Sequence, residues 1–320
     1  MNRILPSILL AAALAFSANA QPRPSGGRGP GPERQPQFNA PAGSYSNQVS
    51  LRISGQYRYI TANGIPDHEP GQFPRHGNPN TIRPQRHSYR LPMNPGTNRV
   101  ATPVQMMPFG IALNGVPFDP NAAEFWRNDF NSGWQYEAKG GSIDLGLDEH
   151  NAHVQPTGAY HYHAMPIGLA RRLFSDDKMV LVGYAADGFP IYARYGPSNP
   201  ADPASELTEM KSSFRIKKGI RPGGPGGTYD GSFIQDYEYV AGAGDLDECN
   251  GRYGPTPEYP KGVYHYFITD DWPYLPRNFR GTPDDSFKRR GPPPGGRGGP
   301  PGGGPGRSRG GPPGGPKRGF

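Results

Sequence analysis

Four of the eight histidines in this 320-residue chain fall within one short stretch: His150, His153, His161 and His163. A β-strand over residues 160–163 would place His161 and His163 on the same face, because side chains alternate along a strand with a period of two. His150 and His153 come just before this strand and could complete the set. Imidazole-rich sites suit Zn, Cu, Ni or Fe better than Ca or Mg. The spacing therefore predicts a transition-metal site, with Cu or Zn favoured.

A carboxylate accompanies the cluster. Asp148 could bind the same metal or orient one of the imidazoles. If the site were catalytic, a metal with an open position could activate water or meet a redox substrate, and Glu149 would be the first candidate for a general base. The spacing does not choose between these reactions, and no organic cofactor is expected. The alternative is structural: interior histidines whose ring nitrogens pair with carbonyls and carboxylates.

Short repeated phrases indicate the elements that position these residues. Asn-Gly-Val-Pro at 114–117 returns as Asp-Gly-Phe-Pro at 187–190, and Asn-Gly-Ile-Pro at 63–66 precedes both. Asn-Gly and Asp-Gly between apolar runs are typical of two-residue β-hairpin turns in which both central residues have positive φ. Three hairpins are therefore expected.

A second phrase repeats in the same order. Leu-Asp-Glu-His-Asn at 147–151, followed by Tyr-His-Tyr at 160–162, returns as Leu-Asp-Glu-Cys-Asn at 246–250, followed by Tyr-His-Tyr at 264–266. An ancient duplication is the simplest explanation. Features that both copies share are best explained by a common structural need, so the differences are the better guide to chemistry. Where the first copy has His150, His153 and His163, the second has Cys249, Arg252 and Phe267.

The fold class expected is mainly β or α+β, a loop-rich single domain over residues 43–285 built from two pseudo-symmetric halves at about 101–176 and 178–280. Aromatic and β-branched runs bounded by Gly or Pro predict strands over 49–53, 57–61, 106–113, 160–163, 179–184, 190–194, 233–240 and 263–268. Helices are expected to be few and short, chiefly over 122–128 and 167–174.

Both ends of the chain differ from this body. Asn2 and Arg3, an apolar run over 4–16 and small residues up to Ala20 predict a removable signal peptide over 1–20 and a secreted or periplasmic location. A Gly/Pro-rich linker is expected over 21–42 and a disordered Gly/Pro/Arg-rich tail over 286–320. No other long apolar stretch follows, so no membrane span is expected.

Charge and cysteine content exclude several classes of protein. The net charge of +7 comes from the ends: eight Lys and Arg and no acid follow Phe287, and the body is mildly acidic. Nucleic acid is not expected as a partner of an exported chain, whereas weak contact of the tail with anionic cell-surface polymers is. The single cysteine, Cys249, excludes a disulfide scaffold. The ligand of the body is not identified by these features.

The tetrapeptide Tyr-His-Tyr-His at 160–163 resembles the motif that gives the secreted YHYH-domain proteins their name. The resemblance extends over most of the body, from Asn-Gly-Ile-Pro-Asp-His at 63–68 to Leu-Asp-Glu-Cys-Asn-Gly at 246–251 and Tyr-His-Tyr at 264–266. It implies an exported protein and brings no established reaction with it. Because the second copy ends in Phe267, only one copy has the full motif, which argues against a symmetric pair of metal sites.

The sequence leaves two functions open. The first is an exported protein of the YHYH type that binds a transition metal through the histidine cluster. The alternative is a non-catalytic extracellular or cell-surface binding module in which the histidines are structural and aromatic loops hold a ligand. The 18 tyrosines of the chain motivate this alternative.

Overall fold

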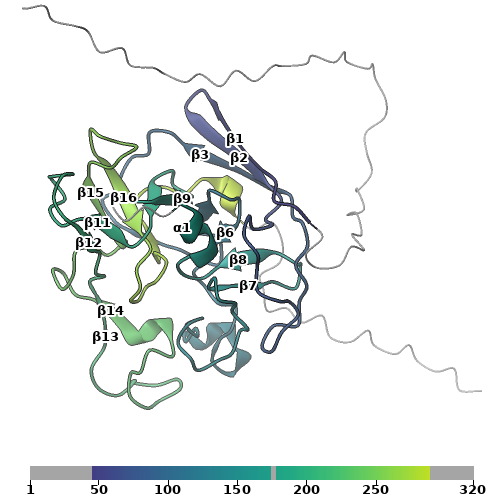
Figure 1. Ribbon diagram of the computed structural model, residues 1–320. Helices are drawn as coiled ribbons and strands as arrows, with labels where there is room; N and C mark the ends of the chain where they lie inside the picture. Colours follow the sequence, from purple (N-terminus) through teal and green to yellow (C-terminus); the bar gives the residue numbers. More distant parts are fainter. Residues whose placement is uncertain (1–44, 174–177, 289–320) are drawn as a thin grey trace, which may run out of the picture. The chain divides into compact units, whose positions relative to one another are not determined.

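The computed structural model describes residues 45–173 and 178–288. Within these ranges short strands and long loops predominate, as the Gly and Pro content leads one to expect (Figure 1). The fold is mostly β, which confirms the predicted class. The predicted signal peptide, the linker over 21–42 and the tail from residue 289 onward lie outside the described residues.

An eight-stranded mixed sheet forms the centre of the described body. Its members are β5 (Gly110–Ala112), β6 (Pro117–Phe118), β7 (Ala152–Val154), β8 (Tyr160–Tyr162), β9 (Leu181–Ala185), β10 (Pro190–Tyr192), β15 (Gly251–Gly254) and β16 (Val263–Phe267). The order across the sheet is β15-β16-β10-β9-β5-β6-β8-β7. From either edge the pairing runs antiparallel, parallel, antiparallel, and the antiparallel pair of β5 and β9 lies at the middle. A common origin of the two halves stays a prediction.

Smaller sheets surround this one. β1 (Val49–Ser54), β2 (Tyr57–Ala62) and β3 (His87–Pro92) form an antiparallel three-stranded sheet. The two-stranded sheets pair β11 (Tyr195–Pro197) with β12 (Leu207–Glu209), β13 (Phe214–Ile216) with β14 (Tyr237–Tyr239), and β4 (Thr102–Pro103) with β17 (Asn278–Phe279). Helical segments are α1 (Ile167–Leu173) and the 3-10 turns η1 (Trp126–Asn128), η2 (Phe130–Ser132), η3 (Ile234–Asp236) and η4 (Asp285–Phe287).

Two of the three predicted hairpins are present, with a different turn from the one expected. The second phrase joins β5 to β6 and the third joins β9 to β10. Only the glycines, Gly115 at φ 80° and Gly188 at φ 94°, have positive φ. Bonds from Gly115 N to Ala112 O and from Ala112 N to Val116 O close a three-residue loop, a type I turn followed by a left-handed glycine.

The prediction of a hairpin at 63–66 was wrong. β2 ends at Ala62 and β3 begins only at His87, so the phrase opens a long loop. The polar residues 67–69 follow Pro66, whereas the apolar Phe118 and Ile191 follow the equivalent prolines of the two phrases that form hairpins. The Asn63 side chain instead accepts bonds from the backbone N–H groups of Gln48 and Ile65.

The prediction of a helix over 122–128 was also wrong. The segment is extended at Phe125, which bridges to Gln135, and only Trp126–Asn128 forms a 3-10 turn. Bonds from Trp126 N to Trp134 O and from Tyr136 N to Glu124 O hold this pairing. Pairing with the segment around Gln135, ten residues further on, thus overrides weak local helix propensity. The helix predicted over 167–174 is present as α1, and residue 174 lies outside the described residues.

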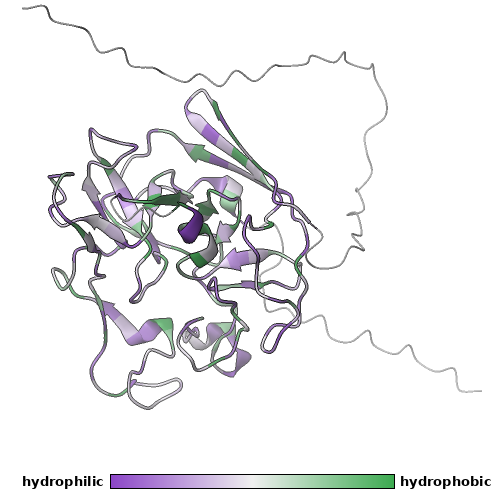
Figure 2. Cartoon of the chain, in the orientation of Figure 1, coloured by the Kyte–Doolittle hydropathy of each residue, from purple (hydrophilic) through white to green (hydrophobic). Residues whose placement is uncertain are grey.

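The hydrophobic core lies along the eight-stranded sheet. β5, β6, β8 and β10 consist of buried residues throughout. β9, at the middle of the sheet, is largely green in Figure 2, whereas the exposed end of α1, with Arg171 and Arg172, is purple. Because both β8 and its neighbours are buried, any polar side chain on β8 must find its partners inside the protein.

Candidate metal centre

The hairpin of β7 and β8 positions the clustered histidines at one edge of the large sheet. His153 and His161 are direct register partners in this antiparallel pair. The connecting turn is closed by bonds from Gln155 N to Ala159 O and from Gly158 N to Gln155 O. A bond from His163 N to Asn151 O, at 2.8 Å, extends the pairing one residue beyond the assigned strand. His163 is therefore held in strand geometry.

The two faces of β8 separate tyrosines from histidines, as the period of two predicts. The Tyr160 and Tyr162 rings contact each other with centroids 5.7 Å apart. The His161 and His163 rings are likewise in contact, at 4.8 Å. One face of the motif thus packs in the aromatic core, and the other face carries imidazoles.

Three imidazoles converge on one point. The Nε2 atom of His163 lies 3.0 Å from Nε2 of His161 and 3.1 Å from Nε2 of His153. One ligand atom from each ring lies within 4.8 Å of those from the other two. The three rings meet edge to face. We call His153, His161 and His163 the histidine triad.

Backbone carbonyls hold the far side of two of the rings. Nδ1 of His153 lies 2.9 Å from the Leu145 carbonyl oxygen, and Nδ1 of His161 lies 3.3 Å from that of Ala159. A carbonyl oxygen only accepts hydrogen bonds, so each of these Nδ1 atoms carries the ring proton in the neutral form. The Nε2 atoms that face the centre of the triad are then lone pairs. A carbonyl behind each imidazole is the usual support of a metal-binding histidine.

Burial favours the neutral form of His153 and His163. Side chains of His161 and His163 are buried and that of His153 is half-buried. Burial lowers the pKa of His163 well below 6.5, and the neighbouring His153 and His161 lower it further. Burial also lowers the pKa of His153, against a smaller opposing effect of the bond to the Leu145 carbonyl. Neutral imidazole is the form that binds metal.

Asp148 is not in this group. Its Oδ1 accepts the backbone N–H groups of His150 and Ala152, and its Oδ2 accepts the N–H of Gly71 and the hydroxyl of Tyr160, the last at 2.6 Å. Four donors thus surround the carboxylate. The residue ties the turn before β7 to β8 and to the loop at Gly71.

His150 lies in a second aromatic contact rather than in the triad. Its Nε2 is 2.9 Å from the Glu69 carbonyl oxygen, and its ring meets that of His68 edge to face at 4.2 Å. The Glu149 carboxylate, the predicted general base, is 3.8 Å from the same Nε2 and is largely exposed. The structure therefore separates His150 from the three histidines that converge.

Two residues near the site were missed by sequence reasoning. His68 Nε2 bonds the Tyr162 hydroxyl at 2.7 Å, on the tyrosine face of β8. Asp119 is 2% exposed, its N–H bonds the Tyr162 carbonyl, and its charge acts on His153. Both come from far along the chain, and only the parallel pairing of β6 with β8, which spacing does not reveal, brings Asp119 there.

The opposite edge of the sheet repeats this framework without the triad. Arg252 and His265 are register partners on β15 and β16, and Phe267 N bonds Asn250 O at 3.0 Å. His265 Nδ1 lies 3.0 Å from the Val263 carbonyl. Cys249 is buried, which raises the pKa of its thiol to about 12 and keeps it protonated at neutral pH.

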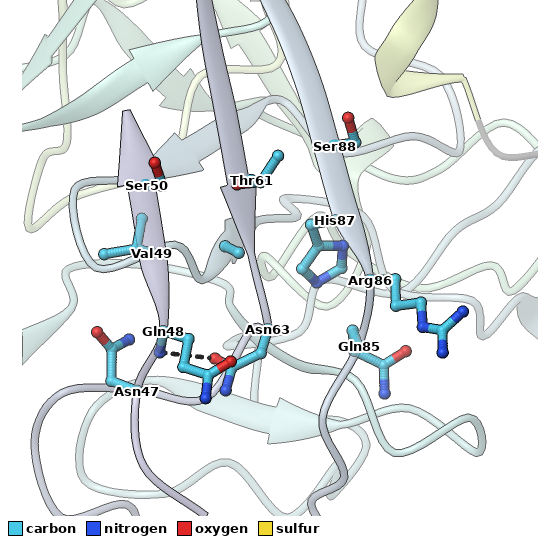
Figure 3. Close-up of a pocket in the computed structure, with 11 residues that line it drawn as sticks. Asn47, Gln48, Val49, Ser50, Thr61, Asn63, Gln85, Arg86, His87 and Ser88 are labelled. Carbon is cyan, nitrogen blue, oxygen red and sulfur yellow. Dashed lines mark hydrogen bonds between the residues drawn. The ribbon is translucent and has the colours of Figure 1, made fainter. Parts of the chain in front are cut away.

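A cavity of about 750 Å³ lies at one end of the three-stranded sheet, apart from the triad. Figure 3 shows amide side chains around it, with the Gln48 N–H donating to Asn63 Oδ1 at 3.1 Å. His87 also lines it, and burial lowers the pKa of this histidine to about 4. No member of the triad contributes to its wall, so the two features are separate.

The family of the chain follows from its match to known sequences. A family model described as YHYH protein matches residues 88–281. The chain belongs to the YHYH protein family. The matched region contains the triad and every strand of the eight-stranded sheet, but it begins after the phrase at 63–68 and leaves out β1 and β2. Comparison with curated proteins and with solved structures gives no match.

Proposed function

We propose that this YHYH protein binds one transition-metal ion, Cu or Zn, through the Nε2 atoms of the histidine triad. The proposal includes export to the periplasm or the cell exterior, which the predicted signal peptide motivates. Within the described ranges no helix has both the length and the apolar character needed to cross a bilayer. The reaction, if there is one, is left open.

The observation that carries the proposal is the convergence of three Nε2 atoms, two of which belong to rings whose proton is on Nδ1. His153 and His161 both direct Nδ1 at a carbonyl, so both present an Nε2 lone pair to His163. His163 Nε2 can carry one proton at most and can satisfy one of these lone pairs. Without a metal, the other lone pair would face Nε2 of His163 at about 3 Å with no proton between the two nitrogen atoms. A cation at the centre satisfies all three.

The spacing also suits a metal. With metal to nitrogen distances of about 2.0–2.1 Å, two ligands of a tetrahedral ion lie about 3.3 Å apart and two adjacent ligands of a square-planar ion about 2.9 Å apart. The Nε2 separations of 3.0 and 3.1 Å fall between these values. Small side-chain shifts would therefore complete either geometry.

The donor set narrows the choice of metal. Three neutral imidazoles favour Zn or Cu over the hard cations, which prefer oxygen ligands. Three protein ligands leave a coordination position open, as in catalytic zinc sites. His153 is the most exposed of the three, so the open position would be reached from its side.

The test is the metal content of protein purified without a histidine tag, stripped with chelator and reconstituted with Zn or Cu. We expect about one equivalent in the wild type and none in His163→Phe. Phenylalanine is chosen because Phe267 occupies the matching position on β16, with the same backbone bond to an asparagine carbonyl, and is fully buried there. This variant should therefore fold.

Two control variants separate metal loss from general effects of removing a histidine. His76→Ala removes a side chain that is 94% exposed, and His265→Gln removes a buried imidazole of the matching hairpin. Both should keep one equivalent. Metal retained by folded His163→Phe, or a wild type that binds none after reconstitution, would contradict the proposal.

A further inference from the structure

The edge of the large sheet opposite the triad borders an open pocket of about 590 Å³. Its wall is formed by β15 and β16, by the loop after β14 and by short segments near Asn98 and Arg280. The volume is in the range of small-ligand sites. Because the triad belongs to the β7 edge, this pocket is independent of the proposed metal centre.

The two most exposed tyrosines of the described residues line this one pocket. Tyr253 is 65% exposed and Tyr239 is 37% exposed. Phe130, at 52%, is the exposed aromatic ring that lies elsewhere. Tyrosine carries a large apolar face and a polar tip, and such rings left uncovered beside a hollow are typical of binding surfaces.

The exposed rings are held in place. Tyr253 lies against Gly262, where an added Cβ atom would come within 2.9 Å of Tyr253 Cε1 and would displace the ring. Tyr239 packs edge to face on Phe214, its partner in the β13 and β14 pair, at 5.6 Å. Rings fixed in advance lose little side-chain entropy when a ligand stacks on them.

The polar lining carries no net charge and leaves acceptors for hydroxyl groups. Asp245 and Asp247 are balanced by Arg252 and Arg280. Asp247 is already occupied, since it accepts Tyr264 Oη and Arg280 Nη2. Asp245 is less occupied, since the backbone N–H of Lys211 donates to its Oδ2 atom only. The pocket thus combines flat apolar rings with hydrogen-bonding groups whose charges cancel.

We propose that this pocket binds a neutral polysaccharide, with sugar rings stacked on Tyr253 and Tyr239 and hydroxyl groups bonded to Asp245 and the polar rim. A sugar ring presents C–H groups on its face and hydroxyl groups at its edge, which matches this lining. The openness of the groove toward solvent suits a chain rather than a small enclosed ligand. A polyanion would gain nothing here from a lining with no net charge.

The test uses the full protein on sensor surfaces coated with dextran, xyloglucan, amylopectin or laminarin, with polygalacturonate as the anionic comparison. We expect saturable binding to at least one neutral polysaccharide. Tyr253→Ala should weaken this binding about tenfold, and the double variant Tyr253→Ala/Tyr239→Ala should not bind. Phe130→Ala, the matched loss of an exposed ring outside the pocket, should leave it unchanged, and so should chelator.

Several outcomes would overturn the inference. These are absence of binding to all four neutral polysaccharides, binding by the folded double variant equal to that of the wild type, and binding to polygalacturonate alone. Loss of binding with chelator would also contradict it, because the pocket and the triad lie at opposite edges of the sheet. Apart from the chelator result, none of these outcomes bears on whether the triad holds a metal.

Discussion

The matching hairpin at the other edge of the sheet should accept a second metal site when two residues are changed. Arg252→His would place an imidazole opposite His265, in the register of His153 and His161. Phe267→His would supply the third ring two residues after His265. The Val263 carbonyl already holds His265 Nδ1, so Nε2 of His265 is set as an acceptor toward the new rings.

The cost and the gain can be estimated from the contacts involved. Arg252 donates to the Pro197 carbonyl at 2.6 Å and lies over the Phe267 ring at 5.4 Å, and losing both contacts costs about 1–3 kcal/mol. Replacing the fully buried Phe267 by a smaller ring costs about 1–3 kcal/mol more. Zinc at a hundred times its dissociation constant would restore about 2.7 kcal/mol.

The assay is metal content together with thermal unfolding of the double variant. We expect two equivalents of metal instead of one, a metal-free melting temperature below that of the wild type, and a rise of about 5–10 °C attributable to the second metal. The single variant Arg252→His has only two imidazoles at this edge and should therefore bind one equivalent of metal, as the wild type does. A folded double variant that binds a single equivalent would refute the reasoning that the register and the carbonyl support make the site.

Two further predictions concern stability. Asp148→Asn places an amide NH2 among four donors and should lower the free energy of unfolding by about 2–4 kcal/mol in urea titrations. The metal content per folded molecule should stay unchanged. Loss of metal without loss of stability would instead make Asp148 a ligand. Burial lowers the pKa of His265 to about 4, against about 6.5 unfolded, so the unfolded chain binds more protons between these values and stability falls as the pH drops. From pH 7 to pH 5 this histidine should cost about 2 kcal/mol, and His265→Gln should remove that part of the pH dependence; an unchanged dependence would show that His265 is not the group responsible.

The triad could be predicted from the sequence only in part. The period of two correctly placed His161 and His163 on one face of β8, and comparison of the repeated phrases singled out His153 and His163. Spacing could not tell that His150, three residues before His153, faces the Glu69 carbonyl and His68 instead. That contact depends on a loop about 80 residues away in the chain.

The same limit applies to the fold. Six of the eight predicted strands are present within one or two residues at each end, because aromatic and β-branched runs dominate there. Of the other two, only 110–112 of the strand predicted over 106–113 and only 237–239 of that over 233–240 are strand, and 234–236 forms a 3-10 turn. The helix expected over 122–128 failed because its partner, around Gln135, lies in another loop. The hairpin phrase was correct where an apolar residue, Phe118 or Ile191, follows its proline, and wrong at 63–66, where the charged or polar residues 67–69 follow instead.

The central claim, that the three Nε2 atoms bind one metal ion, is tested most directly by anomalous diffraction at the metal edge from crystals of the reconstituted protein. We predict one peak about 2.0–2.1 Å from Nε2 of each of His153, His161 and His163. An absent peak, or a peak beside Asp148 and His150 instead, would contradict it.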